Sequence, residues 1–196
     1  MKSFITVFLL RMFSLLPLRV LHSMGNGVGW LFAKTNNRHR FRTRVNLEMC
    51  MPGLTEQARN DLVLRSLQES AKGILEVGTI WIRPADRVMR LIRKTRNIEL
   101  LETALADPRG LILVTPHLGN WELLAFCFSR YRKVTAMYKP SGLSGVDKLV
   151  QDARERAENE LVPTSHKGVA RVRKALGEGG ITIILPDQQP ELLESG

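Results

Sequence analysis

The chain is poor in cysteine and, at its start, in acidic residues. Its 196 residues include two cysteines, Cys50 and Cys127, and no Asp or Glu precedes Glu48. Two cysteines far apart in sequence give no disulfide framework, and an apolar segment around Cys127 predicts a reduced core thiol. Zinc-ligand spacings such as HExxH are also missing. These absences favour a domain that faces a reducing, cytosolic compartment.

A long uninterrupted apolar run is missing as well. Residues 4–18 are mostly apolar, but Arg11 and Pro17 interrupt them, and about twenty apolar residues make a secure membrane-spanning helix. A secretory signal is disfavoured by Arg11, and a mitochondrial transit peptide would be less apolar. We expect an uncleaved membrane anchor in residues 1–33, either spanning the membrane or lying in its interface. Residues 34–196 would then form one further domain, starting with a basic cluster at 34–44 that favours the cytoplasmic side.

The charge is strongly basic, with 29 Lys and Arg against 19 Asp and Glu, a net charge of +10 and a pI near 10.2. An anionic partner is therefore expected. Nucleic acid is one candidate, but the sequence has no recognised nucleic-acid-binding motif. The basic runs adjoin apolar segments, which favours a membrane surface. A simply solvated basic face is the remaining alternative.

Short apolar segments alternate with segments of helical spacing, which predicts an α/β fold around a largely parallel sheet. The predicted strands are residues 111–114, 134–138 and 181–185. The predicted helices include residues 55–78, 147–160 and 169–176, with a loop at 163–168.

The candidate site follows the first of these strands. Thr115-Pro116 ends the apolar run, and His117 comes next, with Glu122 five residues later in the first turn of a predicted helix. Catalytic groups of open α/β sheets collect at the carboxyl ends of the strands. Gly119 allows a tight turn that would bring Glu122 back to hold the imidazole of His117, and Asn120 is the expected N-cap. The alternative is a loop histidine followed by a capping glutamate.

The string TPHLGNWE behind an apolar strand resembles the bacterial lipid A late acyltransferases, which belong to the glycerophosphate acyltransferase-like group with a His-x4-acid motif. Three further segments resemble that family in the same order along the chain: Arg44-x-Asn46-Leu47 with Cys50-x-Pro52, Arg154-x-Arg156, and Leu185-Pro186-Asp187-Gln188. Family members continue beyond the last of these segments. The resemblance therefore implies a glycerophosphate acyltransferase-like α/β sandwich that is incomplete at its C-terminus, with an N-terminal membrane-associated helix.

The resemblance also implies an activity. A fatty acyl chain would pass from acyl carrier protein or coenzyme A to a hydroxyl of an anionic lipid A precursor, at the cytoplasmic face of the bacterial inner membrane. His117 would act as general base with Glu122 as its partner, and the hydroxyl would attack directly, without an acyl-enzyme. Arg154 or Arg156 would stabilise the oxyanion, and no cofactor or metal is required. Asn120 and Asp187 would help to shape the cleft, Asp187 without a catalytic role.

Two other classes of function compete with this interpretation. The first is a non-catalytic, membrane-peripheral lipid-binding protein on the same fold, which the basic charge and apolar N-terminus would serve equally well. Such a protein has no need of a His-acid pair at a strand end. The second is a soluble nucleic-acid-binding protein, which would have no use for the apolar N-terminal segment.

Overall fold

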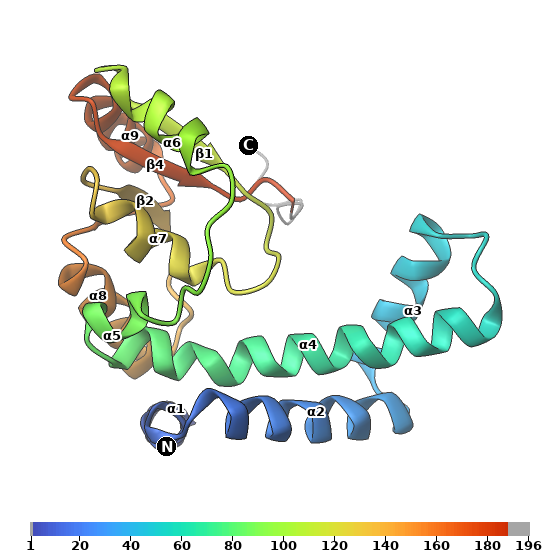
Figure 1. Ribbon diagram of the computed structural model, residues 1–196. Helices are drawn as coiled ribbons and strands as arrows, with labels where there is room; N and C mark the ends of the chain where they lie inside the picture. The colour runs from blue at the N-terminus through green and yellow to red at the C-terminus, as the bar shows by residue number, and fades with distance from the viewer. Residues whose placement is uncertain (1, 188–196) are drawn as a thin grey trace. The chain divides into compact units, whose positions relative to one another are not determined.

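The computed structural model describes residues 2–187, in which six helices precede the first strand and strands then alternate with helices (Figure 1). Gln188, at the end of the string that begins at Leu185, lies outside the described residues. The helices are α1 (Lys2–Leu15), α2 (Leu18–Lys34), α3 (Arg38–Cys50), α4 (Glu56–Ile82), α5 (Ala85–Met89), α6 (Ile98–Ala106), α7 (Glu122–Ser129), α8 (Ser144–Arg156) and α9 (His166–Gly177). The strands are β1 (Leu111–Val114), β2 (Thr135–Tyr138), β3 (Glu160–Pro163) and β4 (Ile181–Ile184).

The strands form two parallel pairs, β1 with β4 and β2 with β3. A bridge between Val134 and Ile181 connects the two pairs, so the spatial order is β1, β4, β2, β3. Ile181 and Val134 are fully buried at this junction, and the hydroxyl of Thr182 donates to the carbonyl of Thr135 at 2.8 Å. The prediction of an α/β fold with parallel pairing is confirmed, and the carboxyl ends of all four described strands lie at the same edge.

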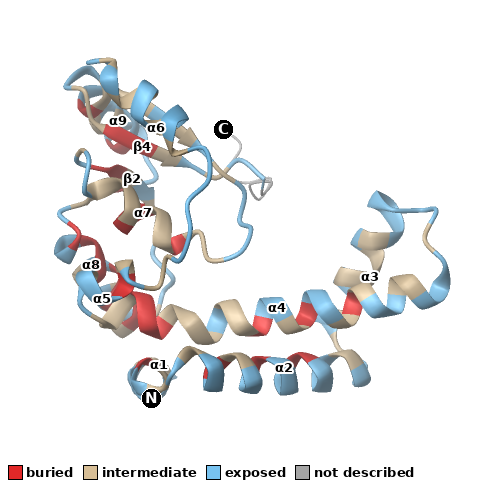
Figure 2. Cartoon of the chain, viewed as in Figure 1, coloured by how far each residue is buried: buried red, intermediate tan, exposed pale blue. Residues whose placement is uncertain are grey.

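The chain divides into two compact units. One comprises the residues up to Phe8 together with those from Ile80 onward, and the other comprises Leu9–Thr79. The core of the first unit lies where the end of α4 meets α5, α7 and α8 (Figure 2). Its buried members are Ile80, Val88, Phe126, Ala153 and Ala157. In the same unit α9 packs on β2, β3 and β4, and the hydroxyl of Ser3 accepts a hydrogen bond from the backbone N–H of Gly145 at 2.9 Å.

The second unit is built on an antiparallel pair of helices, α2 and α4. Gly25 and Gly29 lie one turn apart on α2, and a Cβ at Gly29 would stand 2.4 Å from the Cα of Gln68. Only glycine permits this close approach of the two backbones. Leu21 is completely buried on the same face of α2. Among the described residues, no helix is both long and apolar enough to cross a bilayer.

Several predicted boundaries differ in the structure. Helix α4 continues to Ile82, past the predicted end at residue 78, and α8 begins at Ser144, before the predicted start at residue 147. The predicted helix at 147–160 ends at Arg156, because Glu158 adopts a left-handed conformation with φ of 55°. The following residues, Glu160–Pro163, form the unpredicted strand β3 through their pairing with β2. Helix α9 begins at His166, inside the predicted loop, where the hydroxyl of Ser165 accepts from the N–H of Gly168.

Candidate active site

The pairing of β1 with β4 creates the candidate site. In this pair Val114 lies opposite Ile184. His117 follows Val114 by three residues, and Asp187 follows Ile184 by the same number, each immediately after a proline. Because the strands are parallel and in this register, the two segments leave the sheet side by side and bring His117 to Asp187.

The side chain of Asp187 contacts His117 at two points, the imidazole ring and the backbone N–H. One carboxylate oxygen of Asp187 lies 2.8 Å from Nδ1 of His117, and the other accepts the backbone N–H of His117 at 2.8 Å. These hydrogen bonds hold the pKa of Asp187 below its usual value. An ionised carboxylate only accepts, so Nδ1 carries the proton in the neutral imidazole. The lone pair of Nε2 is therefore the one that can take a proton from a substrate.

The turn after His117 has the conformation expected at a glycine. Gly119 has φ of 61°, in the left-handed region. The indole of Trp121 then meets the imidazole of His117 edge to face, with centroids 5.1 Å apart and ring planes at 77°. Trp121 also occupies the N-cap of α7, so the predicted N-cap at Asn120 is wrong. Asp187 on one side and Trp121 on the other orient the imidazole.

Glu122 does not hold His117. It is buried in the first turn of α7 and accepts two hydrogen bonds, from Nη2 of Arg154 at 2.6 Å and from Nε1 of Trp81 at 3.0 Å. Within residues 2–187 the carboxylate partner of His117 is Asp187, so the predicted contact between His117 and Glu122 is wrong. The spacing predicted a turn that folds back on itself, whereas the first turn of α7 directs Glu122 toward the core. A catalytic role for Glu122 stays a prediction.

The two arginines of the basic pair have partners from different helices. Arg154 is buried against Glu122, and its Nε has no hydrogen-bond partner among the described residues. Arg156 donates to the carbonyls of Trp81 and Ile82 at the end of α4, where a cation also opposes the negative end of the helix dipole. Desolvation lowers the pKa of Arg156. The proposed contact of either arginine with an oxyanion stays a prediction.

Asp187 is the residue whose role the sequence did not reveal. One signal was present: Val114-Thr115-Pro116-His117 and Ile184-Leu185-Pro186-Asp187 both follow the pattern of apolar strand, one residue, proline and polar residue. Two strands with the same ending place their polar residues side by side only if the strands are neighbours in the sheet. The order of residues along the chain does not supply that fact, since three helices and two strands separate β1 from β4.

The chain is similar to enzymes of lipid A synthesis. It is 28% identical over 172 residues to the lipid A biosynthesis lauroyltransferase of Escherichia coli, a match that covers 88% of this chain and 55% of the relative. It is 28% identical over 149 residues to a lipid A biosynthesis acyltransferase of Haemophilus influenzae, covering 75% and 47%. It is also 22% identical over 173 residues to the lipid A biosynthesis palmitoleoyltransferase of E. coli, covering 88% and 56%.

The chain thus spans about half the length of these curated relatives. The sequence model of one family extends over residues 1–192, which include His117, Glu122, the arginine pair and Asp187. With a match over nearly all of its residues, the chain belongs to the bacterial lipid A biosynthesis acyltransferase family.

Proposed function

We propose that this protein transfers a fatty acyl chain from a thioester to a hydroxyl group of a lipid A precursor, with His117 as the general base. The observation that carries the proposal is the pair of hydrogen bonds that the carboxylate of Asp187 accepts from Nδ1 and from the backbone N–H of His117. It fixes the tautomer and the orientation of the ring at the carboxyl edge of a parallel sheet. The names of the relatives and the family match support the same reaction class.

The reaction follows from this geometry. Nε2 of His117 removes the proton of the acceptor hydroxyl while its oxygen attacks the thioester carbonyl carbon, forming a C–O bond and a tetrahedral oxyanion. The negative charge of Asp187 stabilises the imidazolium that results. The intermediate then collapses, the C–S bond breaks, and the departing thiolate takes the proton back from the imidazolium. Atoms and charge balance with one ester and one free thiol as products.

Direct attack by the hydroxyl agrees with the state of the cysteines. Burial raises the pKa of the Cys127 thiol, and a thiol with a raised pKa is a weak nucleophile at neutral pH. Cys50 lies at the end of α3, in the other compact unit from His117. Within residues 2–187 neither thiol is hydrogen-bonded to a base of the kind that an acyl-enzyme mechanism requires.

Charge and exposed apolar surface favour a lipid acceptor and an anionic donor. Leu118, next to His117, is 79% exposed and offers an apolar contact beside the base. The net charge of +10 complements both an acidic acyl carrier protein, or the phosphates of coenzyme A, and a phosphorylated lipid. We propose that the donor is an acyl thioester of one of these carriers.

The N-terminal helices support membrane association. Phe4, Phe8 and Leu15 of α1 are 76%, 58% and 82% exposed, and Trp30 of α2 is 52% exposed. Much of α1 and α2 has the pale blue of exposed residues in Figure 2. Basic residues accompany these side chains, and no acidic residue precedes Glu48. Exposed aromatic and aliphatic side chains with cations are typical of helices that bind an anionic membrane surface. We propose that this region holds the protein on the cytoplasmic face of the inner membrane.

The test is an acyl transfer assay with membranes that contain the protein. Wild-type protein should transfer label from a radioactive acyl thioester to a lipid A precursor, and His117→Ala should lower the rate by about 10²–10⁴-fold. His166→Ala is the matched control, because this histidine is exposed at the start of α9. Equal turnover by His117→Ala and wild type would overturn the proposal. Lipid binding by wild type with no turnover would favour the lipid-binding protein instead.

A further inference from the structure

Arg132, which lies just before β2, connects the segments that lead into β1 and β4. Nη1 of its guanidinium donates to the carbonyls of Arg109 at 3.0 Å and Gly179 at 3.1 Å. Nη2 donates to the carbonyls of Leu105 and, at 2.7 Å, Asp107. The two terminal nitrogens carry four N–H groups, so all four are used on main-chain carbonyls. A rigid, planar guanidinium fixes the relative positions of the groups that it binds in this way.

The two carbonyls that share Nη1 occupy equivalent places in the sheet. Arg109 lies two residues before β1, and Gly179 lies two residues before β4. Their offset in sequence is that of every residue pair in the β1–β4 register. It is also the offset of 70 residues that separates His117 from Asp187 at the other edge of the sheet. Arg132 therefore holds, at the amino ends of the two strands, the same alignment that the candidate site uses at their carboxyl ends.

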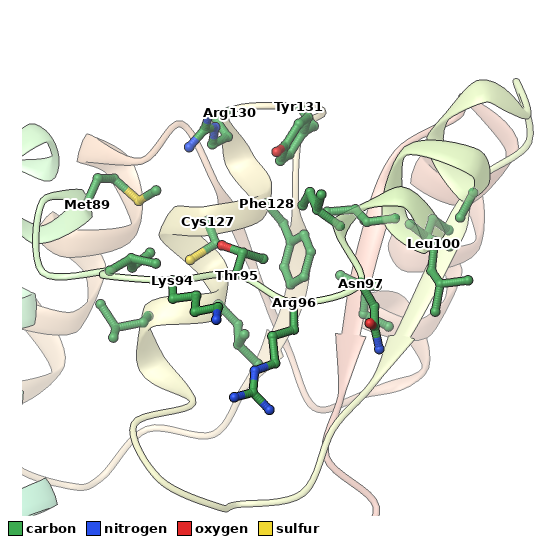
Figure 3. Close-up of a pocket in the computed structure, with 18 of the residues that line it drawn as sticks. Met89, Lys94, Thr95, Arg96, Asn97, Leu100, Cys127, Phe128, Arg130 and Tyr131 are labelled. Carbon is green, nitrogen blue, oxygen red and sulfur yellow. The ribbon is translucent and has the colours of Figure 1, made fainter.

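Side-chain packing constrains the register of β1 only weakly. None of the four side chains of β1 is buried, and Ile112 and Val114 on one face are 50% and 68% exposed. Leu111 and Leu113 on the other face line a pocket of about 920 Å³ between α6 and α7 (Figure 3). Register is strongly specified where one face of a strand is buried, and weakly specified otherwise. The alignment of β1 with β4 thus depends on contacts beyond the strand itself.

A shift of this register would separate the candidate pair. Moving one strand by two residues keeps each side chain on its own face of the sheet. The same movement would displace Asp187 from His117 by roughly 6–7 Å, the rise of two residues along a strand. The carboxylate and Nδ1 now lie 2.8 Å apart, so the hydrogen bond between them would be lost.

We propose that Arg132 is a positioning residue that sets the register of β1 against β4 and thereby brings Asp187 to His117. Within residues 2–187 no hydrogen bond joins Arg132 to either side chain, so it acts through the strands that connect the two edges of the sheet. Its effect on turnover rests on the proposed function, in which His117 is the base. Its effect on the contact between the two side chains does not.

Carboxyl NMR of Asp187 tests the assignment without turnover. Hydrogen bonds with His117 hold the pKa of Asp187 below its usual value, and in Arg132→Met this pKa should rise toward that value. Arg109→Met is the matched control, because its side chain is 86% exposed and the variant keeps the carbonyl that Arg132 binds. The pKa of Asp187 should stay low in this control. An equal Asp187 pKa in the two folded variants would overturn the proposal.

Arg132→Lys keeps the measurement possible if Arg132→Met does not fold. Lysine retains the charge, but its ammonium has three N–H donors and no planar fork, so it cannot bind all four carbonyls. The pKa of Asp187 in this variant should lie between the values in wild type and in His117→Ala. A value equal to that of wild type would overturn the proposal.

A double-mutant cycle separates positioning from a general loss of stability. Arg132→Met should lower kcat at least about tenfold, as Asp187→Asn should, because the imidazole loses its carboxylate partner in both. The double variant Arg132→Met with Asp187→Asn should lose no more than the larger single loss, since both changes break one contact. Fully additive losses would show that Arg132 acts independently of Asp187 and would overturn the proposal. A wild-type protein without turnover would contradict the proposed function instead, and the pKa of Asp187 would then decide the role of Arg132.

Discussion

Two ion pairs that start from the same short stretch have opposite environments. His117 and Asp187 are 28% and 37% exposed at the sheet edge, whereas Glu122 and Arg154 are 9% and 11% exposed within the helical core. Only five residues separate His117 from Glu122. The first pair is open to solvent at the sheet edge, whereas the second is buried and joins α7 to α8.

The difference predicts that this short motif combines a chemical group, His117, with a structural one, Glu122. Screening by water keeps the contribution of the exposed pair to stability small. We therefore expect its main effect to be the orientation of the imidazole. The two charges of the buried pair have lost their hydration, so each is stabilised by its partner instead of by water. Loss of the first should therefore reduce rate, and loss of the second should reduce stability.

Removing the buried pair of Glu122 and Arg154 should have the largest effect, a loss of stability. Glu122→Ala leaves the guanidinium of Arg154 and the indole N–H of Trp81 without their acceptor, at a cost of about 3–5 kcal/mol in the free energy of unfolding. Urea denaturation measures the loss, with Glu155→Ala on the exposed side of α8 as control.

A double variant keeps this prediction testable if Glu122→Ala does not fold. Glu122→Leu with Arg154→Met removes both charges and should recover part of the stability. Glu122→Gln tests the catalytic prediction for the same residue. A folded Glu122→Gln protein without turnover would show that the buried pair belongs to the chemistry, and the contrast would fail.

Asp187→Asn should have a smaller effect than Glu122→Ala, and the quantity that it lowers should be kcat rather than stability. The amide cannot stabilise an imidazolium, so we expect a loss of at least about tenfold in kcat that stays below the loss caused by removing His117. The urea midpoint should hardly change, because the pair is exposed. A large drop in that midpoint, or an unchanged kcat, would refute the assignment of Asp187 as the positioning residue.

The pKa of Asp187 gives a second test of its contact with His117. Its pKa is depressed in the folded protein, chiefly by the hydrogen bond with the His117 ring. The stability that this contact provides is thus present above the ordinary aspartate pKa and is lost as the pH falls through the depressed value. Carboxyl NMR should show the Asp187 pKa returning toward its ordinary value in His117→Ala, and an unaltered pKa would disprove the contact.

The smallest expected effect is on the pH dependence of stability and comes from Tyr138, at the end of β2. This side chain is partly buried, between the buried pair and the exposed pair. Burial, and then its hydrogen bond to Asp147, raise the pKa of Tyr138 to about 12. The contribution to stability is complete below the unfolded pKa near 10 and is lost as the pH rises through about 12. Ultraviolet titration of a Tyr131→Phe protein isolates this phenol, and ionisation near 10 in the folded state would contradict the prediction.

Strands with strong local signals could be predicted, and a strand with a weak one could not. The apolar runs of β1 and β4 and the Lys139-Pro140 end of β2 identify three strands and the parallel class of the fold. β3 contains Glu160 and ends at Pro163, both unfavourable in strands, and it forms because β2 offers its edge. Pairing between distant segments supplied what local propensity did not.

The same limit applies to the site. His117 was predictable because it follows the end of a predicted strand by three residues, and its place at the sheet edge depends only on its own segment. Its partner was not, since nearness in sequence pointed to Glu122 while nearness in space belongs to Asp187. The burial of Glu122 depends on Trp81 and Arg154, which approach from α4 and α8. Such contacts exist only in the folded chain.

The separation of 70 residues between His117 and Asp187 has a consequence for the time at which the candidate site assembles during synthesis. At about 5–20 residues per second, a ribosome adds Asp187 roughly 4–14 s after His117. Until β4 has emerged and paired with β1, the imidazole has no carboxylate to orient it. The nascent chain therefore holds this histidine without its carboxylate partner for the time that it takes to add these 70 residues.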